Sequence, residues 1–307
     1  MPHTWPQLSY EKGHETYETL HLFTQIVGKI KLSKMPWTNH SWHVTLKVTP
    51  YGFTSEALQE KDFSFQLDFD FLQHLFLVKT STGETHSFGL EGLSVAGFYQ
   101  KVKDLLQELG IDCHIHTLPN ELENPIPFEK DETHRTYLPE QAAALHQAFL
   151  KAQEVFTEFR AGFSGKCSPV HLFWGSFDLA VSRFSGKRAP KHPGGVPHLP
   201  DKVAQEAYSH EVYSCGFWPG NSSFPKAAFY SYIYPEPDGL ADSAVKPAAA
   251  FFDKSLREFI LPYQDVQQAS NPTGVLMEFL NRTYEAAAEL AHWDRKELEF
   301  DFHPGKG

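Results

Sequence analysis

Cysteine is scarce in this sequence, with three residues among 307. Cys113, Cys167 and Cys215 are far apart and form no CxxC pair, so neither a disulfide framework nor a thiolate metal site is indicated. No run approaches the roughly 20 apolar residues needed to span a bilayer. The opening residues, MPHTWPQLSYEKGHE, show no basic start followed by an apolar run. We therefore expect a soluble, cytoplasmic protein without a membrane partner.

Basic residues are also in the minority, since 27 Lys and Arg stand against 38 Asp and Glu. A formal charge of −11 repels a phosphate backbone, and only residues 187–191 form a local basic run, so no nucleic-acid partner is expected. Aromatic residues and histidine are abundant instead, with 26 Phe, 12 Tyr, 6 Trp and 17 His. Such a surplus indicates a large core or an aromatic-lined pocket in a folded globular protein.

The first half of the chain has the pattern of a helix, several strands and a second helix. Apolar residues recur at helical spacing and then alternate with polar ones. The predicted elements are a helix over 15–32, strands over 41–49, 63–71, 74–81 and 85–90, a helix over 95–109 capped by Ser94 and ended by Gly110, and a strand over 113–118. Consecutive strands of this kind indicate an antiparallel sheet.

The second half repeats this order. The predicted elements are a helix over 139–163, strands over 168–184, 210–218, 227–234 and 257–263, and a helix over 273–292. The phrase VGKIKL in the first half is echoed by SGKCSP in the second, which raises the hypothesis of an internal duplication. Runs of strands flanked by helices favour an α+β fold over a doubly wound parallel sheet.

We therefore predict an α+β protein of two similarly built halves, each a mainly antiparallel sheet packed by helices. An N-terminal half spans 1–120, and a C-terminal half carrying the candidate site spans 139–307. The segment between them, 121–138, is rich in proline and acidic residues and has no hydrophobic period, so it is expected to be a connection.

The densest group of functional side chains lies in HLFWGSFDLAVSRFSGKRAP, residues 171–190. Read as one strand, this stretch places Trp174, Ser176 and Asp178 on one face, with Arg183 near its exit. Gly175 inside a strand indicates a bulge or the close approach of another backbone or a ligand. Two interpretations stay open: a solvated face where Asp178 pairs with Arg183 or Arg188, or the floor of a pocket under the Pro- and Gly-rich loop 186–200.

Other stretches offer fewer signals. In SHEVYSCGFWPG, alternation places the side chains of His210 and Glu211 on opposite faces of the predicted strand. Trp218 either stacks on a ligand or packs at the end of a hydrophobic core. His114 and His116 stand two apart, a spacing that suits two metal ligands, but no third ligand is fixed nearby, so no metal site is predicted. The chain has no HExxH, P-loop, GxGxxG or GxSxG motif, and the cofactor stays unknown.

Several long motifs resemble one bacterial protein family of about this length, known as a domain of unknown function. They are HLFWGSFDLAVSRFSGKRAP, HPGGVP, SHEVYSCGFWPG and AAFYSYIYPEP in the second half, and QIVGKIKL, NHSWHV, VTPYGFTS and PNELENPIPFEKDETH in the first. The resemblance covers nearly the whole chain and implies that the two halves form one unit. It implies no mechanism. It directs attention to His40, Trp42, His43, Trp174, Ser176, Asp178, Arg183, His210, Glu211 and Trp218.

The leading functional hypothesis is a small-molecule binding protein or an enzyme, with a polar and aromatic cleft in the C-terminal half. In this hypothesis Asp178 or Glu211 acts as acid or base with His210. Arg183 would hold an anionic small molecule. The remaining candidate ligand-binding residues are Trp174, Ser176, Trp218, His40 and His43. The alternative is a non-catalytic interaction module whose aromatic surface binds a protein partner or a second copy of the chain. The sequence leaves the substrate and the oligomeric state open.

Overall fold

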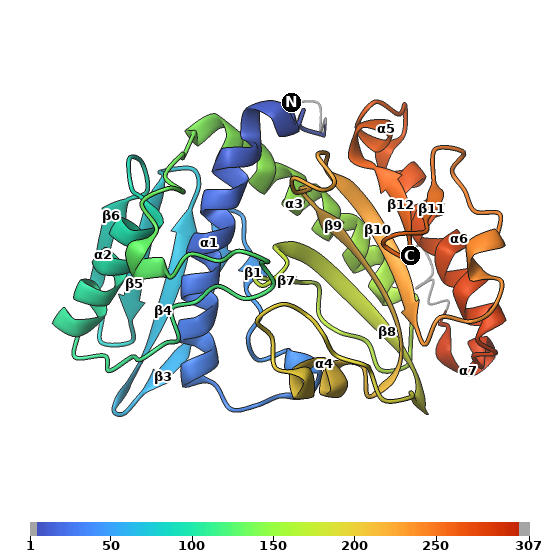
Figure 1. The fold of residues 1–307 in the computed structure, drawn as a ribbon, viewed down its shortest axis with the longest axis horizontal. Helices are drawn as coiled ribbons and strands as arrows, with labels where there is room; N and C mark the ends of the chain where they lie inside the picture. The colour runs from blue at the N-terminus through green and yellow to red at the C-terminus, as the bar shows by residue number, and fades with distance from the viewer. Residues whose placement is uncertain (1–4, 301–307) are drawn as a thin grey trace, which may run out of the picture.

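The computed structural model describes residues 5–300, which form two antiparallel sheets with their helices in two halves (Figure 1). In the N-terminal half the sheet order is β1-β2-β4-β5-β6, and β3 also pairs with β4. Its elements are α1 (Tyr10–Lys34), the 3-10 turn η1 (Asn39–Ser41), β1 (Lys47–Val48), β2 (Gly52–Thr54), β3 (Leu58–Glu60), β4 (Phe63–Asp70), β5 (Leu75–Thr80), β6 (Thr85–Gly89) and α2 (Val95–Glu108).

The C-terminal half has the sheet order β11-β12-β10-β9-β8-β7. After the turn η2 (Phe128–Lys130), its elements are α3 (Pro139–Ala161), β7 (His171–Phe173), β8 (Asp178–Arg188), α4 (Asp201–Ala207), β9 (His210–Trp218), β10 (Ala228–Tyr234), η3 (Leu240–Asp242), β11 (Phe251–Asp253), β12 (Glu258–Pro262), α5 (Tyr263–Gln267), α6 (Pro272–Leu290) and α7 (Arg295–Leu298). Each half thus begins with a helix, continues as an antiparallel sheet and is closed by helices, which confirms the predicted α+β fold.

The two sheets are joined edge to edge. Leu46 and Leu172 exchange two backbone hydrogen bonds, each 2.9 Å between nitrogen and oxygen, so β1 and β7 lie side by side at the centre of the molecule (Figure 1). Beyond this bridge the indole of Trp174 donates from Nε1 to the carbonyl of Val44 at 2.8 Å. The same indole lies against Gly28 of α1, where any side chain would overlap the ring. One hydrophobic core therefore runs through both halves.

Helix α1 is buried on nearly every side over residues 16–31, because α2, α3 and β3 all pack against it. The ammonium groups of its two buried lysines donate hydrogen bonds to backbone carbonyls. Lys29 donates to Leu118 and Lys31 to Thr45, each at 2.7 Å. Burial lowers the pKa of Lys29 to about 8. These bonds fix the segment before the connection and the segment before β1 to the same helix.

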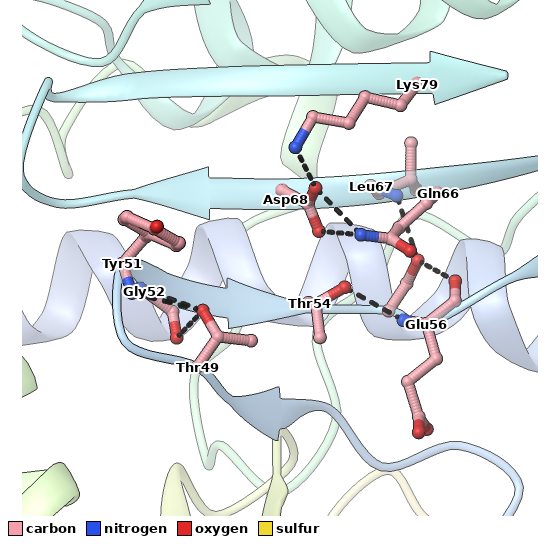
Figure 2. A network of polar contacts seen from close by, with 10 residues as sticks. Thr49, Tyr51, Gly52, Thr54, Glu56, Gln66, Leu67, Asp68 and Lys79 are labelled. Atoms are coloured by element: carbon pink, nitrogen blue, oxygen red, sulfur yellow. Dashed lines mark hydrogen bonds and ion pairs between the residues drawn. The ribbon is translucent and has the colours of Figure 1, made fainter. Parts of the chain in front are cut away.

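A polar network ties the strands of the N-terminal sheet together (Figure 2). Lys79 of β5 pairs with Asp68 of β4 at 3.1 Å, and the same carboxylate accepts from Gln66 at 2.8 and 2.9 Å. The Ser55 hydroxyl accepts from the Leu67 backbone at 2.9 Å. This bond holds the turn between β2 and β3 against β4.

Three predicted strands differ in the structure. Within 41–49 only residues 47–48 are a strand, because η1 holds the chain in a tight turn with His40 and Ser41 at positive φ. Residues 113–118 are not a strand, since this segment pairs with no sheet edge. The predicted strand 168–184 is a hairpin, in which β7 and β8 pair across residues 174–177. The ends of the predicted halves, 1–4 and 301–307, lie outside the described residues.

Candidate functional site

A group of carboxyl and tyrosine side chains gathers where β8, β10 and β12 meet the connection and helix α4. We call it the carboxyl–tyrosine cluster; its members are Glu121, Asp178, Tyr208, Tyr230, Tyr232 and Glu258. The opposite sheet face carries the alternating apolar residues that pack on α3 and α6, such as Phe217 against Phe149. The cluster therefore lies on the face of the C-terminal sheet that these helices leave uncovered.

Asp178 is the first residue of β8 and is only 6% exposed. Both carboxylate oxygens accept hydrogen bonds, Oδ1 from the Ser176 hydroxyl at 2.5 Å and Oδ2 from the Tyr230 hydroxyl. Burial raises the pKa of Asp178, while these two hydrogen bonds act in the opposite direction. Asp178 is thus the fixed centre of the cluster.

Glycine allows Tyr230 to reach Asp178. Strand β9 lies between β8 and β10, and its Gly216 pairs with Ala180 on one side and with Tyr230 on the other. A side chain at Gly216 would overlap the Tyr230 hydroxyl and the Leu179 carbonyl. The tyrosine therefore crosses β9 over a position that only glycine leaves open.

Glu121 joins the cluster from the connection between the halves. Its backbone N–H donates to Pro197 of the Pro- and Gly-rich loop at 2.9 Å. Its carboxylate lies against Gly175, where a side chain would overlap it. Burial and the nearby Asp178 carboxylate raise the pKa of Glu121 to about 7. Gly175 lies in the turn between β7 and β8 rather than inside a strand, and the group that approaches it is a side-chain carboxylate, not the backbone or ligand expected from the sequence.

Helix α1 positions this approach. The Nε2 atom of His21 is 2.8 Å from the carbonyl of Gly175 and donates to it, since a carbonyl only accepts. Burial lowers the pKa of His21 to about 4, so the ring is neutral at pH 7. The Gln25 side chain bonds Asn120 in both directions, at 2.8 and 2.9 Å. One face of α1 thereby holds both the β7–β8 turn and the backbone beside Glu121.

The remaining members complete an aromatic and acidic surface. The hydroxyls of Tyr208 and Tyr232 lie 2.8 Å apart, and the Tyr230 and Tyr232 rings lie parallel with centroids 6.1 Å apart. Burial, together with Asp178 and Asp253, raises the pKa of Glu258 to about 8. Within residues 5–300, no lysine or arginine forms an ion pair with the carboxyl groups of this cluster.

In a comparison with known protein families, residues 5–300 match the family model described as "Family of unknown function (DUF5996)". The chain belongs to this family. The match takes in both halves and every member of the carboxyl–tyrosine cluster, so DUF5996 is defined over the two joined sheets. No curated protein and no solved structure shows significant similarity to the chain.

Neither a membrane-spanning helix nor a metal centre is found in residues 5–300 of this DUF5996 chain. No helix in this range is long and apolar enough to cross a membrane. Across the same range, no group of three or more His, Cys, Asp and Glu side chains is arranged to hold a metal ion. His114, one of the two histidines with ligand-like spacing, is exposed and lies 3.3 Å from the carboxylate of Asp112.

The structure separates the candidate residues of the 171–190 stretch. Ser176 and Asp178 lie together in the cluster. Trp174 is in the core between the halves, because the hairpin turn removes it from the strand face. Arg183 lies on the opposite face of β8, where its guanidinium stacks 3.5 Å from the Phe159 ring centroid and donates to the Phe159 carbonyl. It is therefore not available to hold a ligand beside Asp178.

The other candidates lie away from this cluster. His210 begins β9 and pairs with Arg188 at the far end of β8 from Asp178, so these two candidates for acid–base chemistry do not converge. Glu211 accepts from the Ser185 hydroxyl at 2.7 Å. Trp218 stacks on Phe224 with ring centroids 5.7 Å apart.

The first-half candidates also have defined places. His40 lies beside His210, with ring centroids 6.0 Å apart. The Nδ1 atom of His43 accepts from the backbone of Thr38 at 3.1 Å, which closes a local turn.

Sequence reasoning missed Glu121, Tyr208, Tyr230 and Glu258, and it favoured a plain strand end over a pocket position for Tyr232. A signal existed for both strand tyrosines, because alternation in AFYSYIY puts Tyr230 and Tyr232 on one face of the strand. Glu121 stands in a segment without any period, so nothing in its neighbours indicates that it approaches Gly175.

Proposed function

We propose that the carboxyl–tyrosine cluster binds a small organic cation, an amine that carries one or more ammonium groups. The observation that carries this proposal is a group of three carboxyl side chains, Glu121, Asp178 and Glu258. Asp178 helps to raise the pKa of each of the other two, and no lysine or arginine within residues 5–300 forms an ion pair with any of them. Such a group costs folding free energy, and strongly perturbed carboxyls of this kind concentrate at functional sites.

The chemistry of the cluster suits an ammonium ion. An ammonium between the carboxyl groups would favour their charged forms and offset their mutual repulsion. The tyrosine rings add aromatic faces that attract a cation, an interaction worth about 0.5–2 kcal/mol. The anionic ligand expected from Arg183 is disfavoured here, because that guanidinium lies on the other face of the sheet.

A second candidate function, catalysis at the same place, is favoured by Glu121. This carboxyl is half-buried rather than sealed, and its pKa of about 7 allows it both to accept and to release a proton near neutral pH. Glu121 would then be the general acid or base acting on the bound amine. In that case Glu121→Gln removes turnover while amine binding persists at the remaining carboxyls.

Thermal unfolding of the full chain with putrescine, spermidine and choline tests the binding proposal, with sodium chloride at equal ionic strength as reference. We expect at least one amine to raise Tm, by mass action. Asp178→Asn should abolish the shift, and Glu121→Gln should reduce it. Glu123→Gln, an exposed position two residues from Glu121, should retain it.

If none of the three amines raises Tm above the salt reference, the binding proposal is wrong. Self-association measured by sedimentation would then favour the interaction-module alternative. We also propose that the protein is cytoplasmic. Its three cysteines form no disulfide in the structure, which is consistent with a reducing compartment.

A further inference from the structure

A second group of functional side chains lies at the other end of β8 and β9, away from the carboxyl–tyrosine cluster. The Nζ atom of Lys166 is 2.7 Å from Nε2 of His40, which η1 brings from the N-terminal half. The ring of His210 is next to His40, and Arg188 pairs with His210 across the strands. The amine-binding proposal uses none of these groups.

The hydrogen bonds of His40 define which of its nitrogens carries the proton. Its Nδ1 atom is 2.8 Å from the carbonyl of Ala207, and because a carbonyl only accepts, Nδ1 must donate. His40 is 4% exposed, and burial lowers its pKa, so the ring is neutral at pH 7. The lone pair of Nε2 therefore faces Lys166, which donates to it.

Two aromatic rings flank Lys166, whose Nζ atom lies 5.3 and 5.2 Å from the ring centroids of Trp42 and Phe184. These rings stabilise the ammonium form. Partial burial lowers the pKa of Lys166, although Glu206 acts in the opposite direction. The residue as a whole stays exposed to solvent. A reactant can therefore reach an amine that is already hydrogen-bonded to a base.

The backbone of η1 is held in an uncommon conformation to make this contact. His40 and Ser41 have φ of 58° and 59°, a region that non-glycine residues rarely adopt. The Glu206 carboxylate accepts from the His40 backbone at 2.8 Å and holds the turn in place. Strain of this kind persists where the surrounding structure enforces it, often at functional sites.

We propose that Lys166 is a nucleophilic amine that forms an imine with a small carbonyl compound carrying an anionic group, and that His40 accepts the proton. Nucleophile, base and orienting group form one hydrogen-bonded chain, from Lys166 through His40 to Ala207. The free amine of Lys166 forms a bond to the carbonyl carbon, and one N–H proton passes through Nε2 of His40 to the carbonyl oxygen, which gives the carbinolamine. His40 then takes the second N–H proton and delivers it to the hydroxyl, which leaves as water, so no oxidant or reductant takes part.

The anionic group follows from the charges beside the amine. Arg188 and Lys166 both lie close enough to His210 to lower the pKa of that histidine. Glu206 is the acidic group among these neighbours, and it is engaged by the His40 backbone. A carboxylate or phosphate on the carbonyl compound would therefore meet positive charge beside the reacting amine.

Trapping the imine tests the proposal. The full chain is incubated at pH 7 with glyoxylate and sodium cyanoborohydride, and labelled lysines are quantified by peptide mass spectrometry over time. We expect Lys166 to be labelled at least about tenfold faster than Lys202, an exposed lysine of α4, because a positioned base accelerates proton transfer by this much or more. An uncharged aldehyde of similar size should label Lys166 more slowly than glyoxylate does.

Two variants separate reactivity from folding. Lys166→Arg should remove the fast label, and Lys202→Arg should retain it. His40→Asn keeps a residue that tolerates positive φ but removes the base, so labelling of Lys166 should slow and shift to higher pH. Unfolding midpoints of all variants show whether each is folded. Equal labelling of Lys166 and Lys202 in the folded wild-type chain, or a rate unchanged by His40→Asn, would overturn the proposal.

Discussion

The hydroxyl of Tyr230 on β10 donates to the carboxylate of Asp178 on β8, across the intervening strand β9. This contact exists because Gly216 leaves the space above β9 empty. It fixes one oxygen of Asp178, while Ser176 fixes the other. The carboxylate at the centre of the cluster is thus held rigidly before any ligand arrives, which lowers the entropy cost of binding.

The contact predicts that Gly216→Ala destabilises the protein. A methyl group there would displace Tyr230 and press on the Leu179 carbonyl, so we expect a loss of about 1–3 kcal/mol in the free energy of unfolding. Urea unfolding measures it. Gly89→Ala on β6, where no atom lies near the added methyl, is the matched control. Equal stability of the two variants would show that Gly216 is not needed for the crossing.

The raised pKa values of Glu121 and Glu258 predict a pH dependence of stability. Each folded-state pKa, about 7 and about 8, lies above the usual 4.5, so the folded protein binds more protons than the unfolded chain in between. Stability should therefore fall as the pH rises from about 4.5 to about 8, by an amount on the order of 3–4 kcal/mol per group.

Glu121→Gln and Glu258→Gln test this dependence, because a neutral amide removes the charge that burial disfavours. Both variants should be more stable than the wild-type chain at pH 8 and should show a flatter decline of stability above pH 4.5. Glu123→Gln should follow the wild-type curve. A wild-type slope that survives in both variants would place the responsible groups elsewhere.

The core between the halves predicts that they unfold together. Trp174→Phe removes the hydrogen bond to Val44 and opens space beside Gly28. We expect a loss of about 2–4 kcal/mol with a single unfolding transition retained. Fluorescence and circular dichroism should report the same midpoint. Two separate transitions in the wild-type chain would show that the halves fold independently.

Arg183 offers a prediction that separates packing from ligand binding. Because its guanidinium stacks on Phe159, Phe163 and Tyr284, Arg183→Met should change the unfolding midpoint. The size of the amine-induced shift in Tm should stay as in the wild-type chain. Loss of that shift in a folded Arg183→Met variant would contradict the placement of Arg183 outside the site.

Periodicity predicted most of the architecture, because long amphipathic segments carry their own signal. The helices over 95–109 and 139–163 and the strands over 63–71 and 210–218 agree with the structure within a few residues. Residues 168–184 were misread because the turn at 174–177 contains Trp174 and Phe177, apolar residues that continue the strand pattern. Phe177 adopts φ of 58°, which local sequence does not reveal for a phenylalanine.

The candidate site could be predicted only in part, for a related reason. Asp178 was identified because it interrupts an apolar strand, and its face follows from alternation. Glu121 and Tyr208 come from segments outside the sheet and reach Asp178 through tertiary contacts. The sequence offers Arg183 or Arg188 as the partner of Asp178 on a solvated face, and Arg183 as the anion-binding group of the same cleft, because these residues are close in sequence. An odd separation of five along β8 places Arg183 on the opposite face from Asp178.

The most direct test of the account is proton release when an amine binds. At pH 6.5 much of Glu121 and Glu258 is protonated, so an ammonium that favours their charged forms must expel protons. The amine that gives the largest Tm shift, putrescine, spermidine or choline, is titrated into the protein in a calorimeter. The titration is done in two buffers with different heats of ionisation, and the difference in binding heat gives the number of protons released. We predict net proton release that falls in Glu121→Gln and is unchanged in Glu123→Gln. Binding without proton exchange, or binding unaffected by Glu121→Gln, would contradict the central claim.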